Sequence, residues 1–263
     1  MLGHDPGVVR AQPGSVERSS MGRQAVDLKS AAGTNVGLVR PQNEDSHHCV
    51  HPLYVVADGL GGHAAGEVAS RMVVERLQEI SLAEGVDPEA AGAQLAEAVR
   101  DANRRIHTSA TEVPEHSGMG TTVTAAVAVG ETLCFAHVGD SRGYLYRGGE
   151  LQHVTDDHTP VQRAVRAGVI SAEEALRHPS RHVLAQAVGL DVDVEVDTPT
   201  VDLQSGDRIL LCTDGLTDPV PDQEIARLLE RFDTPDAAVD GLIRQALAGG
   251  GPDNVTLIVI DVS

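Results

Sequence analysis

The chain has 263 residues, of which 41% are hydrophobic, and its formal net charge is −19 at pH 7. This length and composition suffice to bury a sizeable core in one large domain or two small ones. Because an acidic surface repels nucleic-acid phosphates and anionic lipids, the composition argues against nucleic-acid and membrane partners. No apolar run approaches the roughly 18 residues of a membrane span, and residues 1–24 lack the hydrophobic segment of a signal peptide. A cytoplasmic protein is therefore expected.

The amino-terminal segment differs in composition from the rest of the chain. Residues 1–24 are rich in Gly, Pro, Ser and Arg without apolar periodicity, and we expect a disordered leader or tag there. No repeat or low-complexity segment interrupts residues 25–263, which predicts one folded domain. The sequence leaves open whether the chain is a fragment of a longer protein. The cysteines at positions 49, 134 and 212 lack CxxC spacing, which favours reduced core residues over a disulfide or a zinc site.

The first half of the domain combines a buried strand, two helices and a run of hairpins. Residues 53–57 (LYVVA) predict a buried strand, and the apolar spacing of residues 67–80 predicts a helix after it. Asp87 followed by Pro88 marks the start of a second helix, whose apolar face continues to Ile106. Gly-containing turns then separate four predicted strands: residues 122–129, 133–138, 143–147 and 150–154.

The second half is mixed. Residues 159–190 carry a Ser171-x-x-Glu174 capping box in a polar stretch, which predicts a helical excursion over the surface. A helix is predicted to start at Thr234-Pro235 and to end at the three glycines 249–251. Further strands are predicted over residues 194–201, 208–212 and 255–261. Since strands and helices come in blocks and hairpins join the strands, the fold class is α+β, with packed antiparallel sheets and helices outside.

Four aspartates adjoin the most apolar predicted strands. Asp58, Asp140 and Asp214 follow strands in VVADG, AHVGDS and LLCTDG, and Asp253 precedes the last strand in GPDN. Any one of them alone is more often a turn residue, because Asp-Gly is a common turn dipeptide. Gathered at one edge of a sheet pair, the four carboxylates would repel one another unless cations neutralised them. The recurrence therefore favours a divalent-metal site.

The donor atoms indicate the class of metal and of reaction. Carboxylate and carbonyl oxygens, with neither Cys nor a paired His motif nearby, favour Mg²⁺ or Mn²⁺ over zinc. Gly59 has no Cβ and suits a close approach of its carbonyl to a metal. Two such ions bridged by a hydroxide supply a nucleophile for phosphate-ester hydrolysis. Arg40, in the polar loop GLVRPQNEDS, is a candidate partner for the phosphate dianion, although alone it would be taken for an ordinary surface residue.

Taken together, these segments resemble the metal-dependent Ser/Thr protein phosphatases of the PPM, or type-2C, family in its bacterial form, in the family's order from about Val26 to the carboxyl terminus. The resemblance implies a four-layer α-β-β-α sandwich, in which helices flank two central antiparallel sheets. It also implies a mobile flap over residues 156–190, opened by the segment TDDH, beside the metal cleft. The implied activity is hydrolysis of phosphoserine and phosphothreonine in proteins by attack of a metal-bridging hydroxide on phosphorus.

The resemblance also assigns ligands. Asp58, Asp214 and Asp253, with the Gly59 carbonyl, would hold two catalytic Mn²⁺ or Mg²⁺ ions, and Asp58 would bridge them. Asp140, together with a second role of Asp214, would hold a weaker third ion. The implied partners are phosphorylated proteins, namely Ser/Thr kinases and their substrates in bacterial signalling, and a monomer is expected.

Four more residues around these ligands receive roles from the resemblance. Arg40 matches the phosphate-binding arginine of the family. Glu44 and Asp45 match acids that hold metal-bound waters, and Asn254 would support the ligands from behind.

One position departs from the family pattern. Leu60 stands where many eukaryotic members have a histidine, which is taken there as the acid that protonates the leaving alkoxide. That role is not carried over, and the acid stays unassigned, with a metal-bound water as one alternative. His63 is expected to be structural, and His158 is expected to be a solvated loop residue rather than an acid or a substrate contact.

Other functions compete with a general protein phosphatase. A phosphatase dedicated to a single phosphorylated regulator would have the same catalytic residues, so only the flap and the surface could distinguish it. A pseudophosphatase that binds phosphoproteins without turnover predicts lost ligands, yet none of the four aspartates is missing. An acidic metal-buffering protein is disfavoured because EF-hand spacing is absent.

Overall fold

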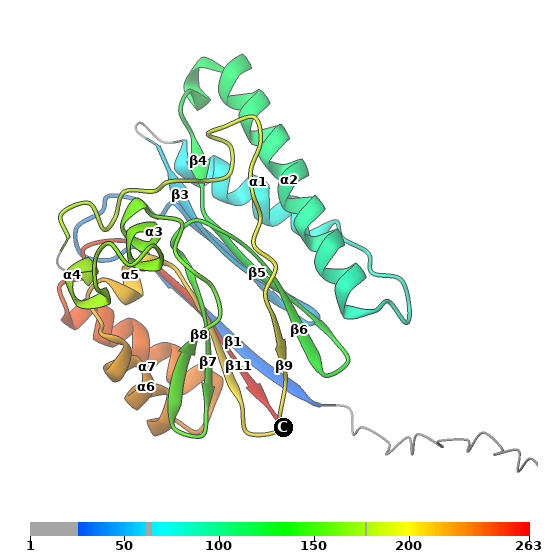
Figure 1. The fold of residues 1–263 in the computed structure, drawn as a ribbon, viewed down its shortest axis with the longest axis vertical. Helices are drawn as coiled ribbons and strands as arrows, with labels where there is room; N and C mark the ends of the chain where they lie inside the picture. The colour runs from blue at the N-terminus through cyan, green and yellow to red at the C-terminus, as the bar shows by residue number, and fades with distance from the viewer. Residues whose placement is uncertain (1–25, 62–64, 177) are drawn as a thin grey trace, which may run out of the picture.

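The computed structural model describes residues 26–61, 65–176 and 178–263, in which two antiparallel sheets pack face to face (Figure 1). The predicted leader of residues 1–24 lies outside the described residues. One sheet has the strand order β2-β3-β5-β6-β9, with β4 paired to β3, and contains β2 (Asp45–Val50), β3 (Leu53–Leu60), β4 (Gly120–Thr121), β5 (Val123–Val129), β6 (Thr132–Val138) and β9 (Thr200–Asp202). The other has the order β1-β11-β10-β7-β8 and contains β1 (Leu28–Asn35), β7 (Arg142–Arg147), β8 (Glu150–His153), β10 (Arg208–Cys212) and β11 (Val255–Val262).

Helices cover the outer face of each sheet. Helices α1 (Gly66–Gln78) and α2 (Pro88–Glu112) pack on the β2–β3–β5–β6 side, whereas α7 (Pro235–Ala248) packs on β1 and β11, with α6 (Asp222–Arg231) beside it (Figure 1). Three buried apolar clusters hold these layers together, and they contain Val73 under α1, Phe135 between the sheets and Leu242 under α7. Their burial is the main favourable term of folding. The predicted four-layer α-β-β-α sandwich is confirmed.

The predicted helix starts are confirmed by their caps. The Asp87 side chain accepts a hydrogen bond from the Ala90 amide at 2.8 Å, with a proline in the first turn of α2. Thr234 caps α7 in the same way. Ser171 and Glu174 bond reciprocally at the start of α4 (Ala172–Leu176), as the capping box requires. These side chains satisfy backbone amides that have no partner inside the helix.

The predicted strand over residues 194–201 is wrong in extent. Only β9 (Thr200–Asp202) is a strand there, preceded by a single bridge between Asp197 and His137. The alternating sequence resembles a strand, but Pro199 has no amide hydrogen to donate to a ladder. The segment therefore follows the edge of β6 in short contacts rather than as a continuous strand.

Other elements were not predicted. These are β1, β2, β4, α6, the short helix α5 (Asp214–Thr217) and the 3-10 turn η1 (Pro114–His116), whereas the short helix α3 (Pro160–Arg166) lies within the predicted helical excursion of residues 159–190. Strand β1 (LKSAAGTN) carries a weak apolar pattern and is a strand because it pairs with β11 along its whole length. Tertiary pairing of this kind overrides local propensity.

The small-residue segment 118–122 packs tightly at the entrance of a strand. Met119 is fully buried, and a Cβ on Gly120 would lie 2.9 Å from a methyl group of Leu190. The cysteines are free, as predicted: Cys134 and Cys212 are buried in strands, whereas Cys49 is only half-buried.

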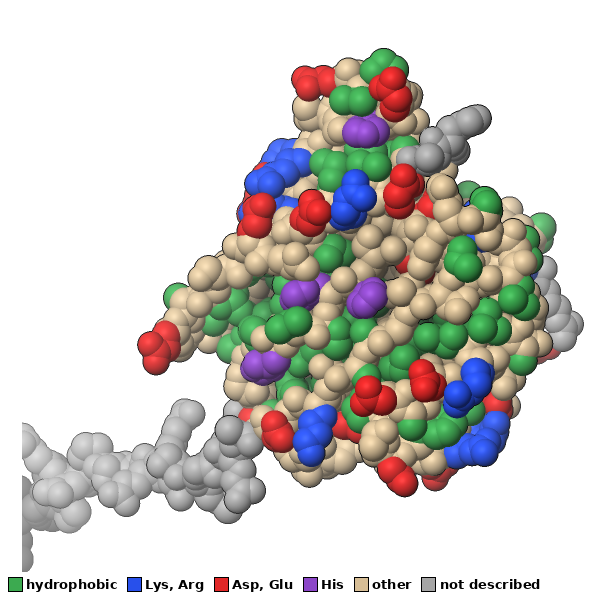
Figure 2. Space-filling model, turned by 180° about the vertical axis from the view of Figure 1, so that it is seen from behind, with side chains coloured by type: hydrophobic (Ala, Val, Ile, Leu, Met, Phe, Trp, Pro, Cys, Tyr) green, Lys and Arg blue, Asp and Glu red, His purple; other side chains and the backbone are tan. Residues whose placement is uncertain are grey.

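The net negative charge is not gathered on the face seen in Figure 2, where acidic and basic side chains are interspersed. Opposite charges also pair between the helices, since Arg76 of α1 and Arg105 of α2 both pair with Asp101, at 2.5 and 3.0 Å. None of the helices in the described ranges is both long and apolar enough to span a bilayer.

Candidate metal centre

The four predicted aspartates line one cavity of about 380 Å³. Its described walls are formed by Arg40, Glu44, Asp58, Gly59, Leu60, Gly61, Asp140, His182, Leu184, Asp214, Asp218, Asp253 and Asn254. Strands β3 and β6 run in the same direction within one sheet, and the end of β10 lies beside the start of β11 in the other. Both sheets therefore bring their aspartates to the same end of the sandwich, as the sequence predicts.

Asp58 lies within a strand rather than after one. Strand β3 continues to Leu60 by pairing with β4, so the expectation that the strand stops before the aspartate is corrected. The Asp58 amide donates to Thr122 Oγ1 at 3.0 Å, and the Asp58 carbonyl accepts from Thr121 Oγ1 at 2.8 Å. These two threonines fix the backbone on both sides of the carboxylate, which holds it rigidly at the cavity wall.

Gly59 occupies a place that admits no side chain. A Cβ there would lie 2.2 Å from the Gly66 carbonyl oxygen and 2.6 Å from that of Glu44. The Gly59 amide donates to the Glu44 carbonyl at 3.2 Å. The backbone of β3 thus passes between two other segments at the cavity, where only glycine fits.

Asp214 begins the short helix α5, directly after β10 and Thr213. Gly215 is required for this turn, because a Cβ on it would lie 1.9 Å from the Asn254 carbonyl oxygen. Thr213 Oγ1 donates to Asp45 Oδ2 at 3.0 Å. Asp45 therefore stands behind the cavity, bonded to the residue that precedes Asp214, and is not among the lining residues.

Arg40 reaches the cavity from the loop before β2 and forms an ion pair with Asp253 at 2.5 Å. Asn254 holds this loop: its amide nitrogen donates to the carbonyls of Val36 and Gln42, both at 2.9 Å, and its Oδ1 accepts from the amide of Glu44 at 2.8 Å. In the structure Asn254 thus fixes the loop of Arg40 against the start of β11, and its support of the metal ligands stays a prediction.

Burial and mutual repulsion raise the pKa values of the clustered carboxyls. Burial, reinforced by the charges of Asp214 and neighbouring acids, holds the pKa of Asp58 and that of Asp140 well above the ordinary value. Burial raises the pKa of Asp214 to about 6, with Asp218 and Asp253 adding to the effect. Burial also raises the pKa of Asp45 to about 7. Without a cation these carboxyls hold protons more readily than free aspartates, and a bound cation would replace those protons.

The residues fit a hard divalent ion. Oδ1 of Asp214 and Oδ1 of Asp45 are buried and have no hydrogen-bond partner among the described residues. A buried carboxylate oxygen without a partner is costly in a metal-free protein. The donors at the cavity are mainly carboxylate oxygens, which suit Mg²⁺ or Mn²⁺. These features of the fold support the metal site that the sequence predicts.

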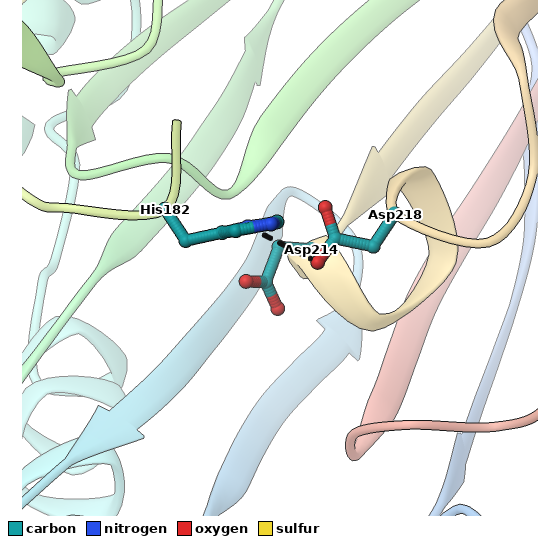
Figure 3. Close-up of side chains that lie close together, drawn as sticks. All are labelled: His182, Asp214 and Asp218. Carbon is teal, nitrogen blue, oxygen red and sulfur yellow. Dashed lines mark ion pairs between the residues drawn. The ribbon is translucent and has the colours of Figure 1, made fainter. Parts of the chain in front are cut away.

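Two lining residues with ionisable side chains, His182 and Asp218, were not predicted, and Figure 3 shows how they lie. His182 Nδ1 pairs with Asp218 Oδ2 at 3.2 Å, and one ligand atom from each of His182, Asp214 and Asp218 lies within 4.8 Å of the others. Asp218 follows Asp214 by four residues and shares its face in the helical turn of α5, a turn that the sequence did not predict. Nothing in the sequence around His182 marks it.

The remaining predicted residues have separate outcomes. Glu44 and Leu60 line the cavity, and His63 lies outside the described residues. The expectation of a solvated loop for His158 is wrong, because its side chain is only 12% exposed and bonds to Asp197. His158 packs against the ring of His137, with 4.8 Å between ring centroids.

Comparisons with known proteins agree with this geometry. The family model described as protein phosphatase 2C matches residues 41–247. The serine/threonine protein phosphatase PstP of Mycobacterium tuberculosis is 45% identical over 247 residues, which cover 92% of this chain and 46% of PstP. The serine/threonine phosphatase stp of Listeria monocytogenes is 37% identical over 240 residues, which cover 87% of this chain and 93% of that protein. The chain thus spans about half the length of the mycobacterial relative.

Solved structures show the same fold. The crystal structure of M. tuberculosis PstP has a TM-score of 0.83 at 45% identity and covers 89% of this chain and 98% of that one. The PstP catalytic domain in complex with two manganese ions has a TM-score of 0.81 at 42% identity and covers 90% and 99%. The α-β-β-α sandwich, the aspartate-lined cavity and the matching family model agree, and the chain therefore belongs to the protein phosphatase 2C family.

Proposed function

We propose that the chain is a metal-dependent phosphatase that hydrolyses phosphoserine and phosphothreonine in proteins. The observation that carries the proposal is the convergence of Asp58, Asp140, Asp214 and Asp253 on one cavity that Arg40 also lines. Relatives in this family are named serine/threonine protein phosphatases, which supports the same reaction here. The intact set of aspartates favours turnover over a pseudophosphatase.

Asp58, Asp214 and Asp253, with the Gly59 carbonyl, would hold two Mn²⁺ or Mg²⁺ ions, and Asp140 with Asp214 would hold a weaker third. When bound, such ions supply an activated water and stabilise negative charge on the phosphoryl oxygens. A related catalytic domain binds two manganese ions, which supports this assignment. The third ion rests on the position of Asp140 at the cavity wall, where burial and the charge of Asp214 raise its pKa.

Arg40 would bind the phosphate dianion of the substrate. Its side chain is 50% exposed at the cavity, and its ion pair with Asp253 uses one nitrogen of the guanidinium. The remaining donors of the planar fork are available for bidentate contact with phosphate oxygens. Asn254 fixes the loop of Arg40, so the guanidinium is oriented before the substrate arrives.

We propose that the natural substrates are phosphorylated Ser/Thr kinases and their targets, and that the enzyme acts on them as a monomer in the cytoplasm. The bacterial relatives and the acidic composition support this choice. A phosphatase dedicated to one phosphorylated regulator would use the same cavity. Activity on many phosphopeptides would separate the general enzyme from the dedicated one.

The deciding experiment is hydrolysis of a phosphothreonine peptide by the purified chain after EDTA treatment, with Mn²⁺, Mg²⁺, Ca²⁺ or Zn²⁺ added back. We expect Mn²⁺ or Mg²⁺ to restore turnover, because oxygen donors dominate the cavity. Folded protein that binds Mn²⁺ but shows no turnover with any metal would indicate a phosphoprotein-binding pseudophosphatase instead.

Replacing Arg40 by alanine is expected to weaken substrate binding more than it slows turnover. Loss of a charge-assisted hydrogen bond of about 1.5 to 3 kcal/mol corresponds to a rise of roughly 10- to 100-fold in KM. Steady-state kinetics with a phosphopeptide at saturating metal would measure the change. Arg40→Lys keeps the charge but loses the planar fork of the guanidinium, so its KM should lie between those of the wild type and Arg40→Ala. A change confined to kcat would rule out the phosphate-binding role.

A further inference from the structure

His158 lies where several segments meet at the base of the predicted flap. Its amide donates to the Gly139 carbonyl at 2.7 Å, and its carbonyl accepts from the Ala185 amide at 2.7 Å. Its ring Nε2 lies 3.2 Å from Asp197 Oδ2. One residue thus connects the loop after β6, the returning end of the predicted flap and the segment that follows it.

The ring of His158 also bonds to the backbone of Gly139. The Gly139 amide donates to Nδ1 at 3.3 Å, so in the neutral ring the hydrogen lies on Nε2 and is donated to Asp197. Both backbone groups of Gly139 are therefore held by a single residue. Gly139 has a φ of 112°, and a Cβ on it would lie 2.6 Å from Thr122 Cγ2, so Thr122, the residue between β4 and β5, confines it from the other side.

Asp140 is held between two such contacts. On one side Gly139 is bonded to His158, and on the other Arg142 forms a bidentate pair with Asp157 at 2.8 and 2.7 Å. Two adjacent residues of the predicted flap thus bind the residues on both sides of the aspartate. Asp140, whose side chain lines the cavity, lies between these two sets of contacts.

The returning end of the predicted flap is tied to the same histidine. His182 and Leu184 line the cavity, and the next residue, Ala185, donates to the His158 carbonyl. Gln186 Nε2 lies 3.3 Å from His158 Nδ1 and donates to the Glu195 carbonyl at 2.6 Å. A displacement of residues 182–186 would therefore move His158, and His158 would in turn move Gly139.

From these contacts we infer that His158 is a positioning residue, which couples the predicted flap to Asp140 by holding Gly139 on both of its backbone groups. The kinetic part of this inference rests on the proposed phosphatase function. The structural part does not, because it concerns how the Gly139 amide and the wall segment around Ala185 are held. His158 is not among the described residues that line the cavity, so it acts through Asp140 rather than by contact with the substrate.

Two substitutions separate the two ring nitrogens. In His158→Asn an amide oxygen can take the place of Nδ1 and accept from Gly139, whereas in His158→Gln the amide takes the place of Nε2 and can bond only Asp197. His158→Ala removes both bonds. His153→Asn is the matched control, because His153 also pairs with a carboxylate, that of Asp222 at 2.9 Å, but is 43% exposed and does not line the cavity.

The Ala and Gln variants are expected to lower kcat by roughly 10- to 100-fold, as for the loss of groups that orient a metal ligand. Their KM should change much less, and the metal concentration for half-maximal activity should rise, because Asp140 is a proposed metal ligand. The Asn variant should recover most of kcat, and His153→Asn should match the wild type. Equal kcat in the Asn and Gln variants, or a lower melting temperature with unchanged kcat, would overturn the inference.

Hydrogen exchange supplies a readout that does not depend on turnover. The Gly139 amide should exchange faster in the Ala and Gln variants than in the wild type and the Asn variant. Adding Mn²⁺ should slow exchange at Ala185 in the wild type but not in His158→Ala. If the wild type hydrolyses no phosphopeptide, the proposed function fails, and the exchange pattern alone then decides the inference: unchanged protection of Gly139 in all variants would contradict it.

Discussion

Replacing Asp214 by asparagine should reduce phosphatase activity to about a thousandth of the wild-type value or less, since the several kcal/mol of stabilisation that a metal supplies are lost with the ion. Asp214 lines the cavity, and its Oδ1 is buried without a hydrogen-bond partner in the described structure. An amide of nearly equal volume removes the charge and one metal-binding oxygen without leaving a cavity. The effect is therefore chemical rather than a consequence of unfolding.

The same substitution should stabilise the metal-free protein at neutral pH. Burial and the neighbouring acids Asp218 and Asp253 raise the pKa of Asp214 to about 6, so at pH 7 the side chain is a buried, repelled charge. Removal of that charge relieves repulsion, as is common where a functional site is maintained at a cost in stability. Asp240→Asn, at an exposed position of α7, is the control. Thermal unfolding in EDTA and hydrolysis with Mn²⁺ would test both parts, and wild-type turnover by Asp214→Asn would refute the ligand assignment.

The sequence predicted the chemistry of the site better than its boundaries. The four aspartates could be found because each one adjoins a strand of apolar residues, and strand direction then places their ends together. Asp58 was misplaced relative to its strand, because the two-residue pairing of β3 with β4 depends on a segment more than fifty positions later in the chain. Local patterns carry no information about such pairing.

The residues that the sequence did not reveal owe their positions to loops. His182 and His158 lie in or beside the predicted flap, where neither a period of 3.6 nor a period of 2 organises the side chains. His158 is buried only because residues 185–186 and 195–197 return to it, and a hydrophilic sequence gives no sign of that return. Asp218 lies beside Asp214 through the short helix α5, which the sequence also did not reveal.

The metal-free protein should lose stability as the pH rises from about 4 to about 7 through the carboxyls of the site. The pKa of Asp214 is raised to about 6 and that of Asp45 to about 7, from an ordinary value of 3.8. The folded state therefore binds more protons than the unfolded state in this range, so the contribution is complete below the unfolded pKa and disappears as the pH passes the folded values. Burial lowers the pKa of His137 to about 4, which acts in the opposite direction.

The contribution of the site is isolated by comparing wild type with Asp214→Asn, in which His137 is unchanged. The fall in melting temperature with rising pH in EDTA should be steeper in the wild type than in the variant. Equal slopes would show that the carboxyl of Asp214 does not carry a proton in the folded, metal-free protein.

Added Mn²⁺ should reverse the loss of stability with rising pH, because the metal binds deprotonated carboxylates and binds them more tightly as protons leave. At a hundred times its dissociation constant, an ion that binds only the folded state contributes about 2.7 kcal/mol, or roughly 5 to 10 °C in melting temperature for a domain of this size. The difference in melting temperature between Mn²⁺ and EDTA should therefore grow from about pH 5 to about pH 8, and should be much smaller in Asp214→Asn. A shift that is the same at every pH, or the same in the variant, would mean that the ion binds elsewhere and that the aspartate cavity is not the metal site.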